Sequence, residues 1–166
     1  MENDSIGKMI EELPCQKEGM STKGYFRAYA TAKSMDLNAA REKALVTAKG
    51  RLAGQIETTI KQVTDNYMNE RTFNDAMEFE EKFENLTRAV VNQKLTNIEV
   101  ICEKQSITND NKYNKFIAIQ IEKETFLKDI DEGLSKQQKL QVDYDKKKFE
   151  ELLDAEMDKL AKEQGN

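Results

Sequence analysis

The sequence predicts a single α+β domain, because three patterns follow one another along its 166 residues. An alternating stretch at 24–34 indicates a strand, and a helical repeat of apolar residues covers about 36–69. Two further alternating stretches within 97–124 indicate a β-hairpin. A second helix and a C-terminal helix complete the order β-α-α-β-β-α. We expect a small antiparallel three-stranded sheet packed on a long helix, with the C-terminal helix added to it.

The first expected strand, GYFRAYATAKS at 24–34, has two unlike faces. Phe26 and the alanines that follow at every second position form an apolar face of mostly small residues. The other face carries Tyr25, Arg27 and Tyr29, a set that can serve as a partner or ligand surface. The alternative, which we favour, is that this face is a second buried side of the sheet, covered by the last helix.

Two helices are expected between the strand and the hairpin. The first begins near Ser34 or Asp36, both good N-cap residues, and runs to about residue 69. Its apolar stripe consists of Leu45, Leu52, Ile56, Ile60, Val63 and Tyr67. The second helix ends near 94–97, and its stripe consists of Phe73, Ala76, Phe79, Phe83, Leu86 and Val90.

The hairpin and a final helix complete the predicted fold. A polar turn at 109–112 separates the strands 97–108 and 113–124, and Gly133 predicts a break after them. The final helix carries an apolar stripe of Phe149, Leu153, Met157 and Leu160. We expect this stripe to pack on the chain's own sheet rather than on a second copy of the chain.

The chain divides into three segments on this interpretation. Residues 1–23 form a lead-in, which is a short helical or an irregular segment followed by a loop and holds the only proline of the sequence, Pro14. Residues 24–130 form the α+β core domain. Residues 131–166 form the C-terminal helix, which packs on the core or on a partner.

Two glycines, Gly50 and Gly54, interrupt the long helical repeat. A phosphate-binding loop would follow a strand and place Lys and then Ser or Thr after its last glycine, and neither condition holds. Each helical glycine costs about 1 kcal/mol relative to alanine, so we expect a compensating contact. The hypothesis is that Gly50, Ala53 and Gly54 form a close-packing patch against the strand 24–34 or a crossing helix. Replacing Gly54 by leucine would then overpack that contact at a cost of about 1–3 kcal/mol.

Composition argues against several classes of function. The 26 Lys and Arg and 31 Asp and Glu are intermixed, with a net charge of −5, so no basic stripe for nucleic acid is expected. The sequence contains no histidine, which removes His-based nucleophile pairs and His-ligated zinc. The carboxylates within 78–84 fit a solvated helix face better than a cation or acid–base site. We expect no catalytic residue, no metal and no cofactor.

The two cysteines, Cys15 and Cys102, are far apart in the sequence and outside any Cys-x-x-Cys motif. We therefore expect free thiols rather than a disulfide. No apolar run is long enough for a membrane span or a signal sequence, and no apolar stretch precedes Cys15 as lipid attachment requires. The chain is expected to be cytoplasmic if Met1 is the true start, or otherwise the mature part of an exported protein.

The stretch 24–60 resembles the LPP-twenty lipoprotein family of bacterial envelopes. In that family an aromatic and small-residue strand leads into a helix that begins Ala-Arg-x-x-Ala-Leu, matched here by the residues from Ala40 to Leu45. The hairpin at 97–124 occupies the expected later position, and the resemblance covers about 24–130. The lead-in residues from Glu12 to Cys15 are similar to the ELPC of Bacteroides-type members.

The resemblance implies an α+β fold similar to the dodecin-like arrangement. It also implies an exported, often lipid-anchored protein of the periplasm or outer membrane, without established enzymatic activity, whose signal these residues do not include. We therefore expect a non-enzymatic envelope-associated protein that acts in protein interaction or structure. A protein partner or self-association is expected, but no nucleic acid, and membrane contact only through an anchor absent from this chain. The alternative is a small-ligand-binding module with a pocket between sheet and helices.

Overall fold

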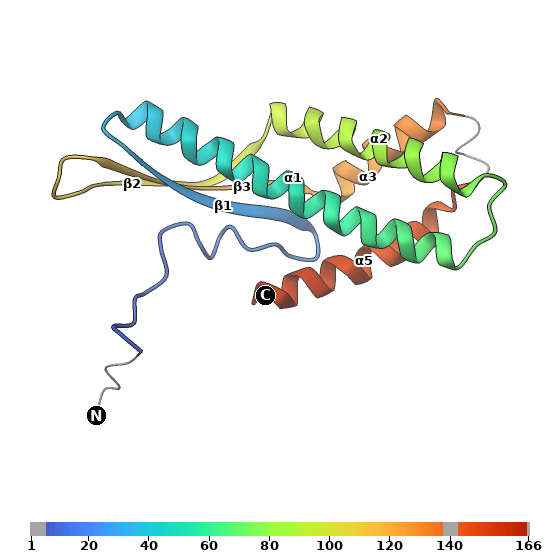
Figure 1. Cartoon of the computed structure of the whole chain (residues 1–166), viewed down its shortest axis with the longest axis horizontal. Coiled ribbons are helices and arrows are strands. Elements are labelled where there is room, and N and C mark those ends of the chain that lie inside the picture. The colour runs from blue at the N-terminus through green and yellow to red at the C-terminus, as the bar shows by residue number, and fades with distance from the viewer. Residues whose placement is uncertain (1–5, 138–142, 166) are drawn as a thin grey trace.

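A computed structural model describes residues 6–137 and 143–165 (Figure 1). Their elements are β1 (Tyr25–Ser34), α1 (Leu37–Asn69), α2 (Ala76–Thr96), β2 (Glu99–Ile107), β3 (Tyr113–Glu122), α3 (Lys123–Ser135) and α5 (Lys146–Glu163). The α+β class and the predicted order β-α-α-β-β-α are confirmed. The structure adds α3, which no sequence pattern predicts, between the hairpin and the final helix.

The described residues form an antiparallel sheet of three strands in the order β1-β3-β2. The predicted hairpin pairs β2 with β3, with a bulge between Val100 and Cys102. On the other side β1 pairs with β3, so that Phe26 lies opposite Ile121 and Ala30 opposite Ile117. The central strand β3 is buried without interruption over 115–121, because both faces of the sheet are covered there.

The first half of α1 lies directly on the sheet. Asp36 caps the helix as predicted, since its side chain accepts a hydrogen bond from the backbone nitrogen of Ala39 at 3.0 Å. The buried Ala44 and Ala48 share one core cluster with Ala28 and Ala30 of β1. Small residues on both surfaces let the helix approach the sheet closely, which brings many atoms to favourable van der Waals distance.

The second half of α1 extends beyond the sheet, where α2 and α5 pack against it and α3 packs against α2 (Figure 1). Neighbouring aromatic rings fill this helical half, with centroids 4.9–6.2 Å apart. They belong to Tyr67, Phe73, Phe79, Phe83, Tyr144 and Phe149. The Tyr67 hydroxyl donates to the carbonyl oxygen of Asp143 at 2.6 Å and accepts from the backbone nitrogen of Asp145 at 2.7 Å. These bonds fix the chain where it enters α5.

The apolar stripe of α5 packs on the chain's own core, and Phe149, Leu153 and Met157 are buried. The surface it meets is α1 rather than the sheet, which corrects one detail of the prediction. The reason is the length of α1, whose second half presents a continuous apolar stripe with no strand beneath it.

The predicted close-packing patch is wrong, because Gly50 and Gly54 lie on the exposed side of α1. A Cβ built on either glycine would have no described atom within 4 Å. Ala53 is half-buried at the edge of the core. The predicted break at Gly133 is also wrong, since this residue lies inside α3, where a Cβ would overlap the side chain of Leu86 on α2. Close packing therefore occurs at Gly133 instead of Gly54.

An ion-pair cluster joins the start of α1 to the hairpin. The Glu103 carboxylate lies 2.5 Å from Nε of Arg41 and 3.5 Å from Nζ of Lys115. The buried Lys115 also donates to the side-chain oxygen of Gln105 at 2.7 Å. Burial raises the pKa of Glu103, but the hydrogen bond from Arg41 and the charge of Lys115 outweigh it. The net pKa lies below its ordinary value.

Replacing Gly54 by alanine should stabilise the protein by about 0.5–1 kcal/mol, because the helix gains propensity and the new methyl group meets no neighbour. Chemical denaturation of the purified protein measures the change. The matched substitution Gly133→Ala should raise stability by less than Gly54→Ala does, or lower it, since its methyl group meets Leu86. A loss of stability in Gly54→Ala would restore the close-packing hypothesis.

Replacing Glu103 by glutamine should lower stability at neutral pH by up to about 1 kcal/mol, the usual range for a partly exposed ion pair. Because the folded-state pKa of Glu103 is lowered, its contribution is present above its unfolded pKa of about 4.3. It is lost as the pH falls through the folded pKa. Melting temperatures of both proteins should therefore converge in acid. The control Glu42→Gln, at an exposed position, should track the wild type, and a Glu103 difference independent of pH would contradict this account.

Candidate functional site

The lead-in covers the second face of the sheet, opposite α1. Of the two predicted alternatives, helical and irregular, the described residues 6–23 have the irregular one, and the last turns of the lead-in pass beneath Tyr29. A Cβ on Gly19 would lie 2.5 Å from the Cβ of Tyr29 and 3.2 Å from its backbone, so only glycine allows this approach. Cys15, Phe116 and Ala118 form a small buried cluster here, to which Tyr29 adds its ring.

The face that carries Tyr25, Arg27 and Tyr29 is covered in part, by the lead-in and not by the last helix. The Tyr29 hydroxyl is buried without a hydrogen-bond partner among the described residues, and burial raises its pKa against the opposing charge of Arg51. Arg27 donates from Nε to the side-chain oxygen of Gln120 at 2.9 Å, and its guanidinium lies 4.9 Å from the Tyr25 ring centre. Tyr25 and Arg27 stay half-buried and reach solvent.

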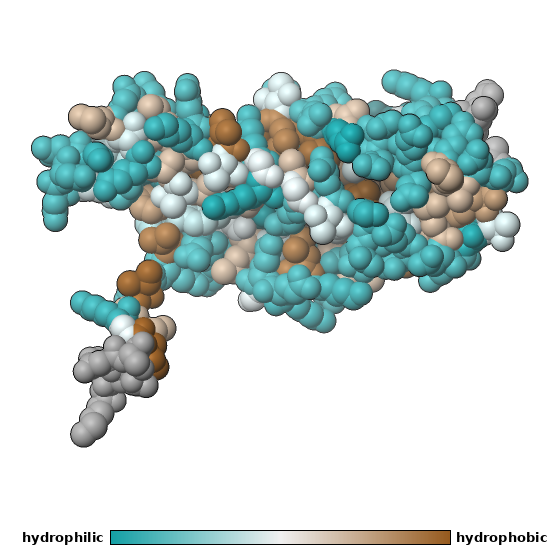
Figure 2. Space-filling model, in the orientation of Figure 1, coloured by the Kyte–Doolittle hydropathy of each residue, from teal (hydrophilic) through white to brown (hydrophobic). Residues whose placement is uncertain are grey.

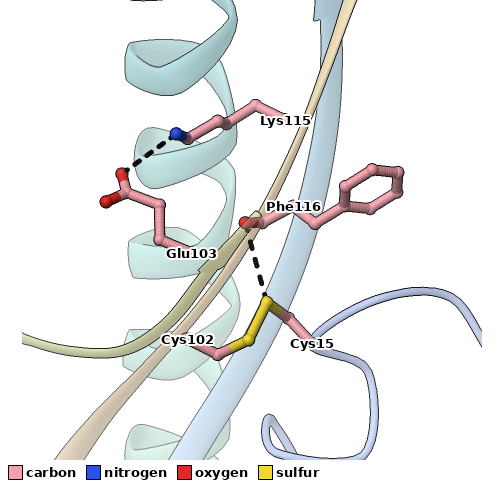
Figure 3. Close-up of a disulfide and its surroundings, with 5 residues drawn as sticks. All are labelled: Cys15, Cys102, Glu103, Lys115 and Phe116. Carbon is pink, nitrogen blue, oxygen red and sulfur yellow. Dashed lines mark hydrogen bonds and ion pairs between the residues drawn. A yellow bond between two sulfur atoms is a disulfide. The ribbon is translucent and has the colours of Figure 1, made fainter. Parts of the chain in front are cut away.

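A disulfide joins Cys15 to Cys102, so the expectation of free thiols is wrong (Figure 3). The lead-in crosses the sheet beside β2, which brings the two Cα atoms to 5.6 Å, within the range that a disulfide spans. Sequence spacing alone could not show this crossing. The sulfur of Cys15 also lies 3.8 Å from the carbonyl oxygen of Phe116, which is a contact and not a hydrogen bond, since a disulfide sulfur carries no hydrogen.

A buried polar network holds the other end of the lead-in. The fully buried Ser21 accepts from the side-chain nitrogen of Gln55 on α1 at 2.5 Å. Its backbone nitrogen donates to the side-chain oxygen of Gln164 at 2.6 Å, and Gln164 donates to Gln55 at 3.0 Å. Three segments far apart in the sequence therefore meet at one point. The network could not be predicted from the sequence, because isolated polar residues carry no periodic signal.

The same network closes part of the outer edge of β1. The Ser21 hydroxyl accepts from the backbone nitrogen of Arg27 at 2.9 Å, and Gln55 donates to the Arg27 carbonyl oxygen at 3.2 Å. Further along, Arg51 donates to the carbonyl oxygen of Tyr29 at 2.7 Å. An edge strand whose backbone groups are occupied does not offer itself for pairing with another strand.

Beyond the disulfide, the lead-in extends away from the body of the protein (Figure 1). Its apolar side chains Ile6, Met9, Ile10 and Leu13 are exposed by 69%, 82%, 83% and 42%. Their spacing of three, one and three residues would place all four on one side of a helix, although the segment has no helix here. This concentration of exposed apolar residues is a candidate contact surface.

A second candidate surface is the groove between α1 and α2, with a volume of about 230 Å³. Its lining residues are Glu57, Thr58, Ile60, Lys61, Thr64 and Asp65 from α1, and Glu80, Phe83, Glu84, Thr87 and Arg88 from α2. In Figure 2 apolar residues are visible between the two helices on a mostly hydrophilic surface. The carboxylates expected on a solvated face partly pair with cations, as in Glu78 with Lys82 at 2.7 Å and Glu84 with Arg88 at 3.0 Å.

In the part of the chain that the structure describes, no group of three His, Cys, Asp or Glu residues could hold a metal ion. No helix there is long and apolar enough to cross a membrane. No family model matches the chain, and no curated protein matches its sequence. The resemblance to envelope lipoproteins therefore stays a prediction.

Removing the disulfide should cost roughly 4–5 kcal/mol in the chain-entropy model, because it closes a loop of 87 residues in the unfolded chain. Denaturant titration of the wild type with and without a reductant, beside the double variant Cys15→Ala/Cys102→Ala, measures this loss. The reductant should destabilise the wild type and leave the variant unchanged. Equal stability of the oxidised and reduced wild type would show that the disulfide holds no part of the folded structure.

Proposed function

We propose that the protein acts in the cell envelope as a non-enzymatic interaction or structural protein. The observation that carries the proposal is the disulfide between Cys15 and Cys102. Disulfides persist in oxidising compartments such as the periplasm and are rare in the cytosol, where thiols are kept reduced. This agrees with export, which the resemblance to envelope lipoproteins also implies.

The exposed lead-in supports a role in interaction. The disulfide ties the segment to the sheet at Cys15, and the four apolar residues before it point into solvent. Such residues gain free energy when they are covered, at about 25 cal/mol for each Å² of apolar surface removed from water. A protein partner or a second copy of the chain that covers this segment would supply that gain.

The alternative, a small-ligand-binding module, finds less support. Between the sheet and α1 the space is filled by core side chains, since Leu52, Ile117 and Ile119 are fully buried. The groove between α1 and α2 is open and smaller than the roughly 300–1,000 Å³ typical of ligand pockets. An interaction surface therefore fits these features better than an enclosed ligand site.

Intact mass spectrometry of the protein recovered from its own cells tests the proposal. Cells are treated with a thiol-alkylating reagent at lysis, and membrane and soluble fractions are kept apart. We expect the envelope fractions to contain a chain that takes up no reagent until it is reduced, because both cysteines are in the disulfide. A lipid-modified N-terminus in the membrane fraction would further support an anchored protein.

The reduced and then alkylated sample is the control, and it should carry two reagent groups. A chain that takes up two groups without reduction and begins at Met1 in the soluble fraction would overturn the envelope proposal.

A further inference from the structure

We propose that the groove between α1 and α2 binds a basic amphipathic helix of a partner protein. The inference rests on the proposed interaction function and names the chemistry of the partner. Both groove walls are helical, and each contributes residues over about nine positions, 57–65 and 80–88. Two turns of a third helix fit such a groove, because side-chain ridges of one helix pack between those of its neighbours.

The floor of the groove offers mainly apolar contact. Ile60 and Phe83 lie at its base, although only 4% and 1% of their surfaces are exposed. The hydroxyl of Thr64 donates to the Ile60 carbonyl oxygen at 2.7 Å, and that of Thr87 donates to the Phe83 carbonyl oxygen at 2.9 Å. The hydroxyl hydrogen of each threonine is therefore already bonded within its own helix. What the floor presents to an occupant is mainly apolar contact.

The rim of the groove is negative. Its charged residues are four carboxylates and two cations, which leaves a charge of −2. Lys61 pairs with Asp65 at 3.5 Å, and Arg88 pairs with Glu84 at 3.0 Å. Among the described residues Glu57 and Glu80 make no ion pair, and they stand on opposite walls. An apolar floor between two unpaired carboxylates matches an apolar ridge flanked by lysines or arginines.

Two other occupants fit less well. The lead-in of a second copy is acidic around its apolar residues, with Glu11 and Glu12 against Lys8, and the rim would repel it. A small cationic amphiphile shares the required chemistry, but an open groove of about 230 Å³ would leave much of it in water. A helix covers the length of both walls and so uses both unpaired carboxylates.

The test uses the full chain and a synthetic 14-residue peptide with leucines on one helical face and lysines beside them. Binding is followed by fluorescence anisotropy at low salt, and the contact surface by amide chemical shifts. We expect the lysine peptide to bind at the groove and its glutamate counterpart to bind at least tenfold more weakly. Binding should also weaken as salt rises, because the attraction is screened.

Two variants locate the site. Glu57→Gln combined with Glu80→Gln removes both charges and should weaken binding about five- to thirtyfold, at roughly 0.5–1 kcal/mol for each of the two partly exposed charge pairs. Thr58→Trp, at an exposed position on the wall, should fill the groove and abolish binding. The control Glu42→Gln removes an exposed charge from the far end of α1 and should bind as the wild type does.

Each contrary result has a definite meaning. Equal binding of lysine and glutamate peptides, unchanged affinity in the double variant, or shifts confined to the lead-in would overturn the proposed site. Binding of dodecyltrimethylammonium at the groove, below its micelle concentration and without peptide binding, would replace the helix by a small cationic ligand. None of these results changes the thiol state or the fraction in which the cellular protein is found, so the envelope proposal is tested separately.

Discussion

The fold depends on one helix that is longer than the sheet it covers. The 33 residues of α1 span about 50 Å and bury a continuous stripe against two kinds of neighbour. Alanines such as Ala44 and Ala48 form the stripe over the strands, where backbone must approach backbone. Larger residues such as Ile60 and Tyr67 form it beyond the strands, where side chains of α2 and α5 fill a wider space. The change from small to large side chains along one stripe therefore joins the sheet and the helical half into a single core.

A second set of contacts covers surfaces of the sheet that α1 does not cover. The disulfide and the glycine contact at Gly19 hold the lead-in over the far face of the sheet, while Ser21 and Gln55 occupy backbone groups of β1. These contacts cover part of that face and occupy part of that edge. The exposed apolar residues of the lead-in and the α1–α2 groove are two of the surfaces that stay accessible in the described chain.

Periodic burial made most of the fold predictable from the sequence. The strand, the long helix, the hairpin and the last helix each repeat apolar residues at the spacing of their own geometry. The same reasoning missed α3, because its Phe126, Ile130 and Leu134 follow β3 without an intervening turn and Gly133 suggested a break. The close packing predicted at Gly54 is absent, since a missing side chain is compatible with both a tight contact and open solvent.

The candidate site was less predictable than the fold. Tyr29 and the residue pair that forms the disulfide depend on where an irregular segment crosses the sheet, and irregular segments have no period. The groove was likewise not predicted, because its two walls become neighbours only after α2 folds back on α1.

The network of Ser21, Gln55 and Gln164 has a consequence for the order in which the protein matures. A ribosome delivers the chain from its first residue onward, so Ser21 and Gln55 emerge long before Gln164. The glutamine that bridges them arrives with the last turn of α5. The contacts of Gln164 with Ser21 and Gln55 can therefore form only after α5 has been synthesised.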